Sequence, residues 1–304
     1  MKHNRYISML LLFLAAFLWG FAFVAQDLVA DIPPMSVGMV RWFIGATFLF
    51  FVIMILDKVS KNGRKLVCKK GFDFTKSEIM GGVVTGIIVS IASVLQQKGI
   101  SEGTSGGKAA FITALYVVLV PIYALFLKKR AKLNVWIAIF IAVVGFYFLC
   151  IKEDIGIVPS DIWIILSAVI YPIHILSIDY FAPKCDCIRM SCLQFFFAFV
   201  INGACAFVFE SPISWMKIGT HIMPFLYLGI CSSGIAYTLQ VVGQRNVHPA
   251  VASLILSLES VFGLLGAVII LGTELTLKEY IGAGMIFLAV ILSQIEFKKK
   301  NRVG

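Results

Sequence analysis

Hydrophobic residues follow one another in long blocks along this chain, and polar residues gather in the short segments between the blocks. An apolar run of about 18 residues or more with few charges is long enough to cross a bilayer as an α-helix. Transmembrane β-strands would instead be about 10 residues of alternating polarity. The pattern therefore predicts an all-α integral membrane protein with ten transmembrane helices, at residues 7–25, 36–56, 79–97, 109–127, 134–151, 162–181, 190–209, 222–244, 249–271 and 279–295.

Composition supports this interpretation. Hydrophobic residues make up 60% of the 304 positions and charged residues 14%, whereas soluble domains are about a quarter charged. The segments between the runs are too short to form a separate soluble domain. There is no Gly-rich phosphate-binding loop of the Walker type, so ATP is not the expected energy source and no cofactor is predicted.

The net charge of +10 is distributed unevenly along the chain. When the connecting segments are assigned alternately to the two membrane sides, 20 of the 26 Lys and Arg residues fall on the side of the N-terminus, 5 fall on the other side, and Arg41 lies within a run. The positive-inside rule then places both termini in the cytoplasm, so the expected location is the inner (cytoplasmic) membrane. We expect Glu274, Lys278 and Glu279 to be solvated in an outer connection.

The basic segments 58–76 and 298–300 are interpreted as topology anchors that contact anionic membrane lipids. Nucleic-acid binding would require stacking aromatic residues beside these charges, and the segments do not supply them. Cys185 and Cys187 have no His or second Cys pair at ligand spacing, so no metal site is predicted.

Two stretches half a chain apart share the pattern A-x-x-L-Q-x-x-G, with Gln96 in the first and Gln240 in the second. Other landmarks recur at a similar spacing and pair the two halves of the chain: Trp19 with Tyr171, and Tyr116 with Glu259. The pattern predicts two repeats of five helices, at residues 1–153 and 154–304, packed in one bundle. Because five is odd, the repeats must have opposite orientations in the membrane, and inverted repeats around a midplane site are typical of secondary transporters.

Several short motifs together resemble a known family. Trp19-Gly20, Arg41, and the segment from Ser257 through Glu259 to Phe262, followed by Leu271-Gly-Thr-Glu274, are similar to the ten-helix branch of the drug/metabolite transporter superfamily with two EamA-type repeats. The resemblance covers nearly the whole chain. The family pattern usually has Pro after the ninth-helix Glu, where this chain has Ser260. The resemblance implies export or exchange of a small metabolite, often amino-acid-like, across the inner membrane.

Glu259 is the first candidate site residue, because an ionisable group near the middle of a span is costly and is usually functional. It could exchange a proton during transport, or it could be a structural carboxyl held by a Ser, a Tyr or Arg41. Arg41 lies about two turns from the outer end of its span. It could extend to the outer surface or hold a substrate carboxylate, and a gating or structural role is favoured.

Aromatic and amide side chains complete the candidate site. Trp19, Tyr116 and Tyr171 lie at mid-depth, whereas membrane aromatics usually gather at the two interfaces. They predict either a pocket for an amphipathic solute or simple helix packing. His174 lies one turn after Tyr171 and could relay a proton with Glu259. The remaining candidates are the repeat-related pair Gln96 and Gln240.

The predicted function is a secondary transporter that works by alternating access on a small amphipathic solute, with proton coupling as a further expectation. An integral membrane enzyme is one alternative, but no paired acidic residues or His-Asp motif mark a membrane face. A non-transporting membrane scaffold is another. The sequence leaves the solute, the direction of transport and the oligomeric state open.

Overall fold

A computed structural model describes residues 2–60, 73–150, 158–272 and 274–295. Within these residues the chain is helical, with short connections and no strand. The helices are, in chain order, α1 (Lys2–Asp27), α2 (Pro34–Ser60), α3 (Lys76–Ser101), α4 (Gly106–Ala114), α5 (Tyr116–Phe126), α6 (Leu133–Cys150), α7 (Asp161–Phe181), η1 (Ala182–Lys184), α8 (Cys187–Phe209), α9 (Trp215–Thr220), α10 (Ile222–Leu226), η2 (Tyr227–Tyr237), α11 (Thr238–Gln244), α12 (Pro249–Leu256), α13 (Glu259–Leu271) and α14 (Leu277–Gln294).

Nine helical stretches among the described residues are long and apolar enough to cross a membrane. They coincide with nine of the ten predicted runs. The other run, 134–151, forms α6, whose described apolar part, Leu133–Leu149, is shorter than those spans. The structure thus shows a multi-helix membrane architecture, and the full count of ten spans stays a prediction.

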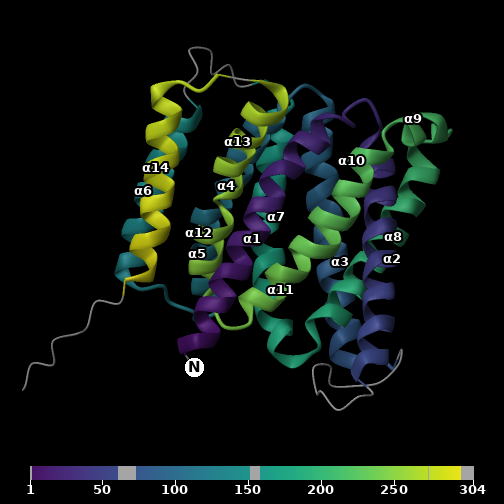
Figure 1. The fold of residues 1–304 in the computed structure, drawn as a ribbon, viewed down its shortest axis with the longest axis horizontal. Coiled ribbons are helices and arrows are strands. Elements are labelled where there is room, and N and C mark those ends of the chain that lie inside the picture. Colours follow the sequence, from purple (N-terminus) through teal and green to yellow (C-terminus); the bar gives the residue numbers. More distant parts are fainter. Residues whose placement is uncertain (1, 61–72, 151–157, 273, 296–304) are drawn as a thin grey trace, which may run out of the picture.

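The helices form one bundle in which segments far apart in the sequence lie side by side. Helix α6 packs against α14 at one edge, α2 packs against α8 near the other, and α1 packs against α13 between them (Figure 1). The N-terminus and the end of α14 lie at the same end of the bundle (Figure 1).

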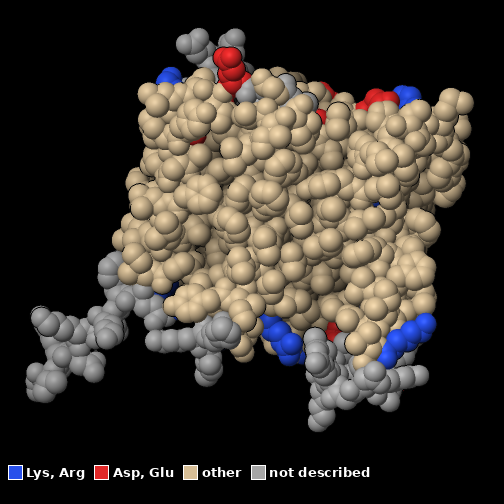
Figure 2. Space-filling model, viewed as in Figure 1, with Lys and Arg blue, Asp and Glu red and all other residues tan. Residues whose placement is uncertain are grey.

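The outside of the bundle is apolar. Figure 2 shows one face on which charged side chains lie almost entirely at the two ends, with the visible blue Lys and Arg groups largest at the N-terminal end. Large apolar side chains on the perimeter, such as Phe140 (70% exposed) and Ile269 (72% exposed), are not covered by other parts of the protein. Such side chains would face solvent unfavourably in a soluble protein, but they suit contact with lipid tails.

Two predicted spans are each divided into two helices near their middle. Span 109–127 is α4 followed by α5, and span 249–271 is α12 followed by α13. The linking residues have almost the same backbone angles: φ −60° and ψ −13° at Leu115, and φ −59° and ψ −14° at Leu258. At both places a backbone N–H donates to the carbonyl three residues earlier, which tightens the turn.

The second interruption forms without the proline that the family pattern has there. The hydroxyl of Ser257 donates to the Leu254 carbonyl and that of Ser260 to the Ser257 carbonyl, both at 2.8 Å. Hydroxyl groups that bond back to the preceding turn compete with regular helix hydrogen bonds and bend the helix.

One expectation for the outer connections is wrong. Glu279 is not solvated but buried, because its carboxylate accepts hydrogen bonds from the Thr276 backbone (2.7 Å) and hydroxyl (2.9 Å) in a capping box that starts α14. The pattern Thr-x-x-Glu was visible in the sequence. Most of segment 58–76 and all of 298–300 lie outside the described residues.

Candidate functional site

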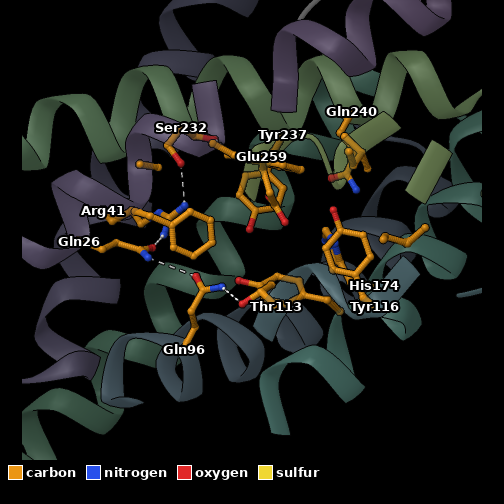
Figure 3. Close-up of a pocket in the computed structure, with 16 residues that line it drawn as sticks. Gln26, Arg41, Gln96, Thr113, Tyr116, His174, Ser232, Tyr237, Gln240 and Glu259 are labelled. Atoms are coloured by element: carbon orange, nitrogen blue, oxygen red, sulfur yellow. Dashed lines mark hydrogen bonds between the residues drawn. The ribbon is translucent and has the colours of Figure 1, made fainter. Parts of the chain in front are cut away.

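The eight candidate residues line one cavity in the middle of the bundle (Figure 3). They come from the predicted spans 1, 3, 4, 6, 8 and 9, and Arg41 adds span 2. The other residues of the lining, which the sequence did not single out, are Ala22, Phe23, Gln26, Thr113, Ile175, Ser232, Tyr237 and Leu256. The structure therefore brings the candidates together, while their roles in binding stay predictions.

Arg41 is buried in the bundle and does not extend to the outer surface. Its Nε donates to Ser233 Oγ at 3.0 Å, Nη1 to Gln26 Oε1 at 3.0 Å and Nη2 to Ser232 Oγ at 2.9 Å. The guanidinium group has five N–H donors, so these three bonds leave capacity for a further acceptor. Hydrogen bonds to two other helices, α1 and η2, offset part of the cost of burying this charge.

Gln26 connects Arg41 to the first of the two repeated glutamines. Its Nε2 donates to Gln96 Oε1 at 3.3 Å, and Gln96 Nε2 donates to Thr113 Oγ1 at 3.0 Å. The resulting chain of hydrogen bonds joins α2, α1, α3 and α4 along one side of the cavity (Figure 3). Gln26 was missed because it follows the apolar run 7–25, although α1 continues through it to Asp27.

A π-helix, η2, supplies the two serines that bind Arg41. In a π-helix each turn is wider, and such segments are frequent at functional sites. The Trp19 indole Nε1 donates to the Ser232 carbonyl at 3.1 Å, and Ser233 Oγ donates to the carbonyl of Leu228, five residues earlier, at 2.8 Å. The irregular helix thus exposes polar atoms to the cavity that a regular α-helix would keep within its own hydrogen bonds.

Unpaired acceptors mark another part of the lining. Glu259 Oε1, Gln240 Oε1 and the Tyr116 hydroxyl are buried, and none has a hydrogen-bond partner among the described residues. The Tyr116 hydroxyl lies beside the Glu259 carboxyl and interacts with it, but the contact does not have the geometry of a full hydrogen bond. No ion pair joins Glu259 to Arg41 in the described chain. A buried polar atom without a hydrogen-bond partner is costly. These three groups are therefore available to accept a hydrogen bond from a further partner.

The interruptions bring Tyr116 and Glu259 to equivalent positions. Tyr116 is the first residue of α5 and Glu259 the first residue of α13, directly after Leu115 and Leu258. Discontinuous helices that line a central site are a feature of several transporter folds. The predicted correspondence between Tyr116 and Glu259 is therefore matched by local backbone geometry.

His174 is buried and its Nε2 lies 3.1 Å from Gln194 Oε1. No hydrogen bond connects His174 to Glu259 among the described residues, so the structure does not show the predicted relay as a direct contact. The aromatic side of the cavity includes a residue that the sequence analysis missed. Tyr237 packs edge-on against Trp19, with ring centroids 4.6 Å apart, and lies within the second A-x-x-L-Q-x-x-G stretch.

The cavity is narrow. Its volume is about 40 Å³, which holds a few water molecules but not a solute of amino-acid size. Binding of such a solute at this site therefore requires the surrounding helices to move apart.

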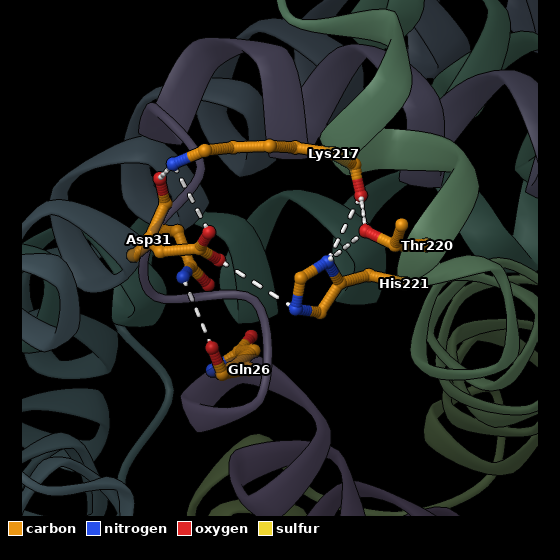
Figure 4. Close-up of polar contacts among 6 residues, drawn as sticks. Gln26, Asp31, Lys217, Thr220 and His221 are labelled. Atoms are coloured by element: carbon orange, nitrogen blue, oxygen red, sulfur yellow. Dashed lines mark hydrogen bonds and ion pairs between the residues drawn. The ribbon is translucent and has the colours of Figure 1, made fainter.

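Beyond the end of the cavity near Gln26, the connection between α1 and α2 is held to α9 and α10 (Figure 4). Lys217 Nζ lies 3.2 Å from Asp31 Oδ2 and donates to the Asp31 carbonyl at 3.3 Å. His221 Nε2 lies 3.7 Å from Asp31 Oδ1. We call these three residues the Asp31 clamp. It lies at the bundle end opposite the N-terminus (Figure 1).

Within the described part of the chain, no group of three or more His, Cys, Asp or Glu side chains is arranged to hold a metal ion.

The sequence model of the EamA-like transporter family matches the chain twice, over residues 6–151 and 158–294. The chain belongs to the EamA-like transporter family. This family lies in the drug/metabolite transporter superfamily, as the sequence motifs predicted, and membership points to a multi-pass membrane protein of transporter type.

Similar proteins agree with this assignment. An Archaeoglobus fulgidus protein named as an uncharacterized transporter is 30% identical over 282 residues, which cover 92% of this chain and 83% of that protein. The uncharacterized transporter YoaV of Bacillus subtilis strain 168 is 21% identical and covers 93% and 95% of the two chains. A solved crystal structure that is 15% identical superimposes with a TM-score of 0.76 over 95% of this chain and 97% of the other, and it supports the fold alone.

Proposed function

We propose that this EamA-family protein is a secondary transporter that moves a small amphipathic metabolite across the cytoplasmic membrane by alternating access. The observation that carries the proposal is the central cavity, where polar and aromatic residues from both halves of the chain converge at the level of two interrupted helices. Ionisable and polar groups inside a membrane bundle are expensive and usually serve transport.

The proposed architecture is ten spans arranged as two inverted five-helix repeats, residues 1–153 and 154–304. Two observations support it. The family model matches each half separately, and the equivalent interruptions at Leu115 and Leu258 have backbone angles within a degree of each other. In this arrangement α6 is the fifth span and α14 its counterpart.

The proposed solute carries an amino group and an apolar body. Glu259 and Gln240 offer acceptor oxygens without partners, and the Tyr116 hydroxyl can accept as well. An ammonium group would satisfy them and balance the carboxylate charge. The rings of Trp19 and Tyr237 provide apolar surface and favour a nearby cation. Arg41, in the same lining, has donor capacity for an anionic group on the solute.

Alternating access follows from the small cavity and from the Asp31 clamp. The cavity of about 40 Å³ must widen to admit a solute, and the clamp holds α1–α2 to α9–α10 at the proposed outer end. Release of the clamp would open a path outward, and separation at the N-terminal end would open a path to the cytoplasm. Export is the proposed direction, and protonation of Glu259 during the cycle is the proposed coupling.

Flux measurements in reconstituted vesicles test the function. Uptake and efflux of a metabolite panel should be followed with and without a pH gradient, using pairs of solutes that differ only in the amino group. We expect the amine to be carried at least about fivefold faster than its neutral counterpart, because an unsatisfied buried acceptor costs about 1–3 kcal/mol. Equal flux for both members of each pair would refute the amine preference, and absence of flux for the whole panel would count against transport of such metabolites.

A further inference from the structure

A second pocket, lined mainly by basic and apolar residues, lies at the N-terminal end of the bundle, away from the central cavity. It has a volume of about 130 Å³, larger than the central cavity. Its lining comes from the start of α1, the connection between α5 and α6, the start of α12 and the end of α14. The lining residues are Arg5, Arg130, Ala131, Lys132, Asn134, Val135, His248, Val251, Ser293 and Ile295. We call it the basic pocket.

The charge in this lining has one sign. Arg5, Arg130 and Lys132 are cationic, and the described residues of the lining include no Asp or Glu. Arg130 and Lys132 form no ion pair with a described acidic residue. The nearby Asp179 is already paired with Lys129. Arg130 and Lys132 therefore give the described wall of the pocket a local excess of positive charge.

Hydrogen-bond donors in the pocket add to this charge. His248 Nδ1 accepts from the Ala250 backbone N–H at 3.3 Å, so in the neutral ring the hydrogen is on Nε2. Burial lowers the pKa of His248, which keeps this ring neutral and Nε2 a donor at pH 7. Helices α6 and α12 begin beside the pocket at Leu133 and Pro249, and helix N-termini favour anions.

The free carbonyl groups at the C-terminal end of α14 carry partial negative charge, but they do not cancel the positive charge of the pocket. Asn134 Nδ2 donates to the carbonyls of Leu292, Ser293 and Ile295 at 3.4, 3.2 and 3.0 Å. This amide occupies acceptors that would otherwise repel an anion, and it fixes α14 against the start of α6. The wall of the pocket is thus held by buried hydrogen bonds rather than by surface side chains alone.

Apolar side chains flank the charged residues. Leu133, next to Lys132 in the chain, is 75% exposed, and Ile295 of the lining is 46% exposed. Exposed apolar groups beside cations match a ligand with a charged head and a hydrocarbon tail. We propose that the basic pocket binds the phosphate group of an anionic phospholipid at the membrane surface. The same donors would also accept a free phosphate, and the experiment separates the two.

The test uses the full-length protein in nanodiscs of phosphatidylcholine with or without phosphatidylglycerol. Retained lipid is counted by native mass spectrometry and thermal stability is measured in parallel. In Arg130→Gln/Lys132→Gln, affinity for phosphatidylglycerol should fall at least about tenfold, because each basic residue near an anionic surface contributes about 1 kcal/mol. Both side chains are exposed, so the fold should be kept.

The matched control is Lys58→Gln/Lys184→Gln, which removes the same charge from two exposed positions outside the pocket. It should retain phosphatidylglycerol as the wild type does. Stabilisation by millimolar inorganic phosphate that is lost only in the pocket double variant, without lipid retention, would assign the site to a soluble phosphate. Equal lipid loss in both double variants, or no loss in either together with no phosphate effect, would overturn the proposal.

Discussion

Glu259 combines burial with incomplete hydrogen bonding. Its side chain is 5% exposed, it lies at the start of a helix in the middle of a span, and Oε1 has no partner among the described residues. Most buried side-chain polar atoms have at least one hydrogen-bond partner, so a buried carboxyl oxygen without one is unusual for a purely structural residue. This environment instead suits a group that gains and loses a partner during a transport cycle.

Replacement of Glu259 tests this role. Glu259→Gln should preserve thermal stability to within about 1 kcal/mol, because Gln is nearly isosteric and avoids the desolvation cost of an ion. It should abolish flux driven by a pH gradient while solute exchange continues. Glu259→Asp should shift the pH optimum of flux and keep activity. Gradient-driven flux and thermal unfolding are measured on the same reconstituted samples.

Glu102→Gln is the control for this prediction. Glu102 is an exposed carboxylate beyond the end of α3, and the hydrogen bond from Lys98 lowers its pKa. Its replacement should leave flux unchanged. Wild-type gradient-driven flux in Glu259→Gln, constant between about pH 6 and pH 8, would rule out coupling through Glu259.

At the scale of helices, close backbone contact joins the two halves beside the cavity. Gly20 of α1 packs directly against Phe262 and Gly263 of α13, so that a Cβ atom at Gly20 would overlap their atoms. Small residues allow this approach in membrane bundles. It positions Trp19, the neighbour of Gly20, on the same helix turn as the contact.

Gly20→Ala should destabilise the protein by about 1–3 kcal/mol, because overpacking forces the backbones apart. Flux should fall as well, since α1 carries Trp19 and Gln26. Gly107→Ala is the matched control: no atom lies within 4 Å of a Cβ placed there, and Ala favours helix over Gly by up to about 1 kcal/mol. Thermal unfolding of both variants compares them, and equal stability would contradict the proposed contact.

The Asp31 clamp is a second contact between helical segments, at one end of the bundle. Its side chains are partly exposed, with Asp31 at 48% and Lys217 at 51%, so the pair contributes about 0–1 kcal/mol. Asp31→Asn should therefore increase the ratio of outward-open to outward-closed molecules by about fivefold or less. Spin labels at Leu28 and Met216, in a cysteine-free background, report the separation of the two elements.

A charge exchange completes this experiment. Asp31→Lys should increase the fraction of long distances, and Asp31→Lys/Lys217→Asp should reduce it again because opposite charges face each other once more. Distance distributions that are identical in all variants would show that the clamp does not control opening.

For the whole molecule, the charge asymmetry makes a topological prediction. The 20 basic residues assigned to one side, against 5 on the other, predict both termini in the cytoplasm. Figure 1 places the N-terminus and the end of α14 at the same end of the bundle. A reporter active only in the cytoplasm, fused at the C-terminus, should be active, whereas a reporter active only in the periplasm should be silent. The reverse result would contradict ten spans with both termini inside.

The sequence by itself determined the membrane class, the approximate spans and the candidate residues. Long apolar runs can satisfy their backbone hydrogen bonds in lipid only as helices. A run such as 79–97 is therefore predicted to be helical from its sequence alone. Glu259 and Arg41 stood out because charges are rare within such runs. The family assignment followed from motifs at fixed spacing and agrees with the two family matches.

Only the tertiary structure decided how these residues meet. Arg41 binds Ser232 and Ser233 from a segment about 190 positions away, and local pattern carries no information on such contacts. The π-helix η2, which packs against α1 and α2, was not foreseen from its sequence. Gln26 and Tyr237 became visible as cavity residues only when helices from both halves were packed around them, because burial and partnership are properties of the assembled bundle.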